Sequence, residues 1–87
     1  MINWEQIQIL RDTYEQLVRS RRNNDQASVR VSQEIIETIR QNLLQQRVHI
    51  DDVQQICRLC EEIAEIRLRM EQNQRLEAHI QVPLRRH

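Results

Sequence analysis

Apolar residues recur every three or four positions between residues 51 and 77, the last long stretch of the chain. Their spacings are 3, 4, 3 and 4, and the residues are Ile56, Leu59, Ile63, Ile66 and Met70. This periodicity places all five on one face of an α-helix. Asp51 is a suitable N-cap, and Asp52 adds negative charge at the positive end of the helix dipole. The pattern predicts a helix over 51–77, roughly 40 Å long.

The first stretch of the chain has the same periodicity. Its apolar positions, at spacings of 3, 4 and 3, are Ile7, Leu10, Tyr14 and Leu17. Asn3 is a good N-cap, and arginines at 19, 21 and 22 complement the negative end of the helix dipole. A first helix is therefore predicted over about 4–22.

A second helix is predicted over about 25–46, after the polar run Arg22-Asn23-Asn24-Asp25. Its apolar positions are Val29, Ile35, Ile36, Ile39 and Leu43. Asn tolerates a left-handed backbone and Asp can cap a helix, so the run favours a turn. Because the run contains neither Gly nor Pro, a helix continuing straight through it is an open alternative.

The expected fold class is all-α, an antiparallel bundle of two to three helices completed by homodimerisation. Residues 1–78 would form the bundle, and 79–87, with Pro83, an extended or disordered tail. The third helix is longer than either partner, so part of its apolar face would stay uncovered in a monomer. The residues expected at the dimer or partner interface are Ile56, Leu59, Ile63, Ile66, Met70, Ile35, Ile39 and Leu43.

Composition supports this interpretation. The chain has no glycine, no phenylalanine and one proline, which argues against a sheet or a barrel. Only 39% of its 87 residues are hydrophobic, and a chain of this size is marginally stable as a monomer. Association of two copies would let two small apolar faces share one core.

Membrane insertion and secretion are not expected. No apolar run exceeds two residues, and the N-terminus lacks the basic and apolar regions of a signal peptide. The expected location is the cytoplasm, where cysteines stay reduced.

No pattern in the sequence predicts an enzyme, a cofactor or a metal site. Cys57 and Cys60 form a Cys-x-x-Cys pair, but a zinc site needs four ligands, so we interpret them as small core residues. Four thiolates shared across a dimer are the less favoured alternative. His49, His79 and His87 have no acid or nucleophile at a recognisable spacing and are expected to be exposed.

The arginines provide the one candidate for a ligand surface. The formal net charge is zero and lysine is absent, so all thirteen basic residues are arginine. In a symmetric dimer, arginines of the first two helices could line one polar helical face. Double-stranded RNA is recognised largely by shape through such surfaces. The candidate RNA-binding residues are Arg30, Gln33, Arg40, Arg47, Arg19 and Arg22.

Two functional hypotheses follow. The first is a small non-enzymatic helical interaction protein, an adaptor, chaperone or inhibitor, that acts through amphipathic helix faces as a homodimer. The alternative is a dimeric double-stranded RNA-binding protein of the viral silencing-suppressor type, an analogy of architecture without a shared motif. For any single arginine, pairing with a nearby glutamate is the more favoured role.

Overall fold

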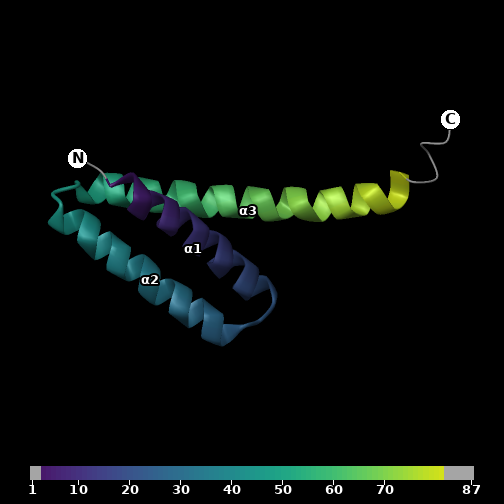
Figure 1. The fold of residues 1–87 in the computed structure, drawn as a ribbon, viewed down its shortest axis with the longest axis horizontal. Helices are drawn as coiled ribbons and strands as arrows, with labels where there is room; N and C mark the ends of the chain where they lie inside the picture. The colour runs from purple at the N-terminus through teal and green to yellow at the C-terminus, as the bar shows by residue number, and fades with distance from the viewer. Residues whose placement is uncertain (1–2, 82–87) are drawn as a thin grey trace.

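The chain folds into three helices, which confirms the all-α prediction. The computed structural model describes the backbone of residues 3–81 and the side chains of residues 3–75. It comprises α1 (Trp4–Arg22), α2 (Gln26–Gln45) and α3 (Ile50–Gln81), with no strand in 3–81. Helices α1 and α2 form an antiparallel hairpin beside α3, and the C-terminal part of α3 extends past the hairpin (Figure 1).

Helix α1 has the predicted limits because its capping signals act as expected. The Asn3 side-chain oxygen accepts a hydrogen bond from the amide of Glu5 at 3.0 Å, which satisfies one of the unpaired N–H groups at the helix start. The helix ends at Arg22, and Asn24 follows in the left-handed region at φ 55°. A left-handed residue just after a helix is a common C-terminal signal.

The polar run after α1 is a turn and not a continuing helix. Asp25 caps α2: its carboxylate accepts hydrogen bonds from the Ser28 amide at 3.2 Å and the Ser28 hydroxyl at 2.7 Å. Asparagine and aspartate together thus reverse the chain without glycine. The turn makes α2 antiparallel to α1, which resolves the alternative that the sequence left open.

Helix α3 begins earlier and ends later than predicted. Asp51 is not the N-cap: the helix starts at Ile50, and His49 Nδ1 accepts a hydrogen bond from the Asp51 amide at 3.1 Å. At the other end α3 continues to Gln81, four residues past the predicted limit, so residues 79–81 are helical and not part of a tail. Residues 82–87 of the predicted tail lie outside the described residues.

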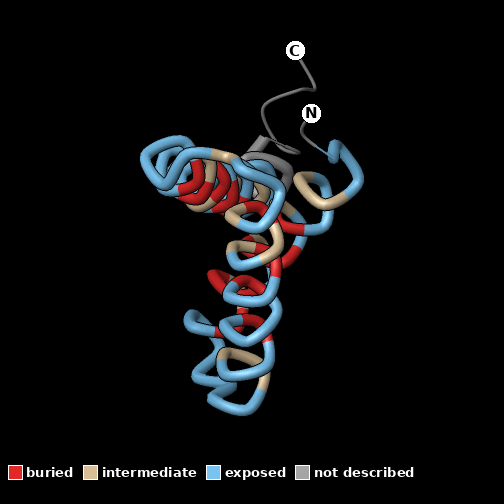
Figure 2. Tube along the Cα trace, turned by 90° about the vertical axis from the view of Figure 1, so that its left-hand side faces the viewer, coloured by how far each residue is buried: buried red, intermediate tan, exposed pale blue. Residues whose placement is uncertain are grey.

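The hydrophobic core lies where α1 packs against both other helices, and α2 meets α3 only slightly. Figure 2 shows buried positions recurring along the inner sides of the helices. The buried hydrophobic residues are Leu10, Tyr14, Leu17, Val18, Ile36, Ile39, Leu43, Val53, Cys57, Cys60, Ala64 and Leu68. Helix α1 is thus the central helix of the fold.

The face of α3 that packs on α1 is not the face with the largest apolar residues. The buried positions of α3 are Val53, Cys57, Cys60, Ala64 and Leu68. Four of these are small or medium side chains, which let two helix backbones approach closely. The face containing Ile63 and Ile66 lies about 120° around the helix from this buried face, as helical geometry requires.

Candidate protein interface

A strip of large apolar side chains on α3 is exposed along the helix. We call Ile56, Leu59, Ile63, Ile66 and Met70 the α3 strip. Ile56 is half-buried, whereas Leu59 is 47%, Ile63 41%, Ile66 51% and Met70 55% exposed. A contiguous apolar patch of this kind, rimmed by charged residues, is typical of an interaction surface.

The α3 strip has the spacing of a coiled-coil seam. Ile56, Ile63 and Met70 are separated by seven residues and occupy heptad position a, and Leu59 and Ile66 occupy position d. Glu62 and Arg69 lie at heptad position g, directly beside the apolar strip. A seam with apolar a and d positions and charged flanks is suited to pairing with another helix.

The expected interface residues of α2 are not part of this surface. Ile39 and Leu43 are 6% and 0% exposed, because both pack in the core of their own chain. Ile35 is 40% exposed, but it lies with Ile9 and Val31 in a groove between α1 and α2 that no α3 residue lines. The candidate interface therefore consists of the α3 strip alone, without the three residues of α2 that were expected beside it.

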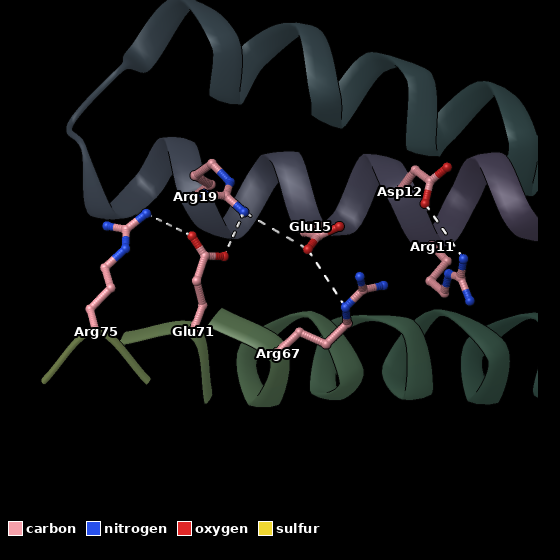
Figure 3. A network of polar contacts seen from close by, with 7 residues as sticks. All are labelled: Arg11, Asp12, Glu15, Arg19, Arg67, Glu71 and Arg75. Atoms are coloured by element: carbon pink, nitrogen blue, oxygen red, sulfur yellow. Dashed lines mark hydrogen bonds and ion pairs between the residues drawn. The ribbon is translucent and has the colours of Figure 1, made fainter. Parts of the chain in front are cut away.

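An ionic network joins α1 to the middle of α3 (Figure 3). Arg19 lies 3.2 Å from Glu71 and 3.9 Å from Glu15, and Glu15 lies 3.8 Å from Arg67. Arg75 lies 3.0 Å from the other carboxylate oxygen of Glu71. The network links α1 and α3 beside the part of the apolar core that contains Leu17, Val18 and Leu68.

The network perturbs one carboxylate and was not predicted from the sequence. Hydrogen bonding and charge from Arg19 hold the pKa of Glu71 below its usual value. Glu71 and Arg75 have the four-residue spacing of a helical ion pair, which sequence reasoning could have noted. The contact of Glu71 with Arg19 joins residues 52 positions apart, and no local pattern reports it.

Two of the candidate RNA-binding arginines are held by carboxylates of their own chain. Arg19 is part of the ionic network, and Arg40 lies 3.8 Å from Glu37. The Nε of Arg40 is buried without a hydrogen-bond partner among the described residues, and its side chain lines a pocket with Tyr14 and Glu61. Both arginines thus lie beside a carboxylate of their own chain, in line with the expectation that single arginines pair with nearby glutamates.

The other candidate RNA-binding residues are not brought together within one chain. Arg22 ends α1, whereas Arg47 follows α2 and lies at the opposite end of the antiparallel hairpin (Figure 1). Arg30 and Gln33 are exposed on α2 between these ends. Arg19 and Arg22 do line one pocket, with Arg75 and Glu71, but neither Arg47 nor any of the candidate residues of α2 shares it. The candidate residues therefore do not form one face among the described residues 3–75.

The two cysteines pack in the core, as we interpreted them. Cys57 and Cys60 are free thiols, 8% and 5% exposed. Burial raises the pKa of the Cys60 thiol, so it stays protonated at neutral pH. Burial, together with the neighbouring Cys57, also raises the pKa of Tyr14. The Cys60 thiol and the Tyr14 hydroxyl are therefore held in their neutral forms inside the fold.

In the described part of the chain, no group of three or more His, Cys, Asp or Glu side chains is arranged to hold a metal ion. None of the described helices is both long and apolar enough to cross a membrane. No protein-family model, no curated protein and no solved structure matches this chain.

Proposed function

We propose that this chain is a small, non-enzymatic helical interaction protein that assembles as a homodimer through the α3 strip. The observation that carries the proposal is the exposure of four large apolar side chains at heptad spacing, Leu59, Ile63, Ile66 and Met70. Each would gain about 1 kcal/mol if a partner helix covered its exposed half. A soluble helix that leaves such a row uncovered is expected to pair with another helix.

A second copy of the same chain fits the charges beside the strip. In a parallel pair, Glu62 would face Arg67 of the second copy; in an antiparallel pair it would face Arg69. Either arrangement gives two equivalent ion pairs by symmetry. Isoleucine at position a with leucine at position d, as at Ile56 and Leu59, is found in two-stranded pairs, which also favours self-association.

Such a dimer would act as an adaptor, chaperone or inhibitor by offering its remaining helix faces to other proteins. The long α3 pair would be the rigid centre, with one α1–α2 hairpin held on each copy by the ionic network and the core. We place this function in the cytoplasm, because two buried free thiols suit a reducing compartment.

Sedimentation velocity tests the proposal with a matched pair of variants. Ile66 and Ile9 are the same residue type with nearly equal exposure, 51% and 52%, on different surfaces of the protein. Ile66→Asp would place a carboxylate against a second apolar strip, which is costly without a partner. We expect the unchanged chain and Ile9→Asp to sediment as dimers and Ile66→Asp as a folded, helical monomer.

Two outcomes would contradict the proposal. One is a chain that stays monomeric at roughly 100 µM, a concentration at which an affinity of about −8 kcal/mol gives nearly complete association. The other is an Ile66→Asp variant that remains dimeric with unchanged helicity. Circular dichroism of each variant separates loss of assembly from loss of folding.

Double-stranded RNA binding is the less supported alternative. Arg19 and Arg40 already pair with Glu71 and Glu37, and binding to phosphate would have to replace those contacts. Phosphate-driven binding weakens steeply with salt. A gel-shift assay with duplex RNA at two ionic strengths tests it: no shift at low salt excludes the alternative, and a salt-sensitive shift lost in Arg40→Ala supports it.

A further inference from the structure

A second apolar surface lies between α1 and α2. Ile9 on α1 and Val31 and Ile35 on α2 are 52%, 55% and 40% exposed. They line two adjoining hollows of about 470 Å³ and 400 Å³ and belong to both. We call this continuous feature the α1–α2 groove. None of its lining residues comes from α3, so it is a surface separate from the α3 strip.

Small side chains create the groove. Thr13 and Ser32 are buried where the two helices meet, and Ala27 and Ser28 line one end. The Thr13 hydroxyl donates a hydrogen bond to the carbonyl of Ile9 at 2.7 Å, so its polar group is satisfied within α1. The Thr13 hydroxyl is thus satisfied within its own helix, while the apolar walls of the groove remain uncovered.

The groove has the dimensions of a helix-binding site. Along α2 it runs from Ala27 to Thr38, a rise of about 17 Å, which is three turns of α-helix. An amphipathic helix of about eleven residues would fit this length with its apolar side on Ile9, Val31 and Ile35. Helices bind such grooves through anchors at i, i+3 or i+4, and i+7.

The charges that line the groove are all negative. Asp12 stands on the α1 side and Glu34 on the α2 side, and both are exposed. Asp12 also lies 3.8 Å from the guanidinium of Arg11, but neither Arg11 nor any other arginine lines the groove. In contrast, arginines line the pockets beside Glu71 and Glu61.

We propose that the α1–α2 groove binds an amphipathic helix of a partner protein whose apolar side is flanked by lysine or arginine. The apolar anchors supply affinity, and the cationic flanks pair with Asp12 and Glu34. This surface does not depend on self-association of α3. A dimer formed through the α3 strip would therefore carry two such grooves, one on each hairpin.

Synthetic helices serve as probes. Two fluorescein-labelled 14-residue peptides would share leucines at i, i+3, i+4, i+7 and i+11 and differ only in flanks of lysine or of glutamate. Fluorescence polarisation with the full chain is expected to show micromolar binding of the lysine peptide. Binding of the glutamate peptide should be at least tenfold weaker, because like charges would meet across the groove rim.

Variants assign the binding to the groove. Val31→Asp should weaken binding of the lysine peptide at least tenfold. The double variant Asp12→Asn, Glu34→Gln should weaken it about fivefold and remove most of its salt dependence. Asp52→Asn with Glu65→Gln changes charge by the same amount at exposed positions of α3 outside the groove and the α3 strip, and is the matched control, with no expected effect.

Three results would overturn the proposal. They are no binding of the lysine peptide, equal binding of the two peptides, and binding that is lost in Ile66→Asp but kept in Val31→Asp. The last result would place the peptide on the α3 strip and not in the groove. Circular dichroism on every variant ensures that each comparison is made between folded chains.

Discussion

From the apolar pattern of α3 alone, truncating Ile66 would be expected to destabilise the chain more than truncating Leu68. The structure predicts the reverse order. Ile66 belongs to the heptad seam and Leu68 does not. In the structure, however, Leu68 is 6% exposed and packs in the core, whereas Ile66 is 51% exposed. A Leu68→Ala variant and an Ile66→Ala variant therefore separate the role of the core from that of the strip.

The expected magnitudes differ severalfold. A buried Leu→Ala change costs about 2–5 kcal/mol, and Leu68 lies at the end of the core, so about 2–3 kcal/mol is expected. For a domain of this size that corresponds to a fall in Tm of roughly 10–20 °C. Ile66→Ala removes about 1 kcal/mol of partial burial and regains some helix propensity, so the fold of a single copy should change by about 0.5 kcal/mol.

Urea unfolding followed by far-ultraviolet circular dichroism measures both values. The protein must be diluted until sedimentation shows a monomer, because association would add its own stabilisation. At higher concentration the Ile66→Ala variant should lose stability relative to the unchanged chain, and this loss should grow with concentration. Equal destabilisation of the two dilute variants, or a larger effect at Ile66, would refute the assignment of the buried face.

Three further predictions concern single residues. Arg47 has φ 67°, so Arg47→Gly should stabilise the chain by about 0.5–1 kcal/mol in the same urea assay, and a loss would mean that its side chain matters more than its backbone. Hydrogen bonds from Ser28 lower the pKa of Asp25 below 3.8 in the folded chain. The ionised Asp25 carboxylate therefore stabilises the fold fully above pH 3.8, and this stabilisation is lost as the pH falls through the lower pKa of the folded chain. Asp25→Ala should thus lower the Tm at pH 7, and the difference from the unchanged chain should shrink as the pH falls below 3.8. Cys60 should react with a thiol reagent only as fast as the chain opens, because burial hides it and raises its pKa; fast labelling of folded protein would contradict its core position.

Local signals in the sequence predicted the limits of α1, whereas they left the number of helices open at two to three. Asn3 and Asp25 cap helices through contacts with residues two or three positions away, and such contacts are written in the local sequence. The start of α3 was predicted one residue late. Asp51 was expected to cap the helix with its side chain, whereas its own amide donates a hydrogen bond to Nδ1 of His49. The run from Arg22 to Asp25 favoured a turn but left a continuous helix open, since it contains neither Gly nor Pro and asparagine is compatible with both.

Which face of α3 is buried follows from contacts between the helices and not from the periodicity of α3. Periodicity shows that Ile63 and Ile66 share a face, but it does not say whether that face meets α1, a second copy or water. The rotation of α3 is set by Val53, Cys57 and Ala64, whose smaller side chains allow close packing on α1, and by Glu71, which pairs with Arg19 far away in the sequence. The α1–α2 groove likewise exists only because the turn at Asn24 brings Ile9 beside Val31. Local sequence fixes helices because their hydrogen bonds are local, whereas the exposed surfaces depend on contacts between distant residues, and those contacts exist only in the folded chain.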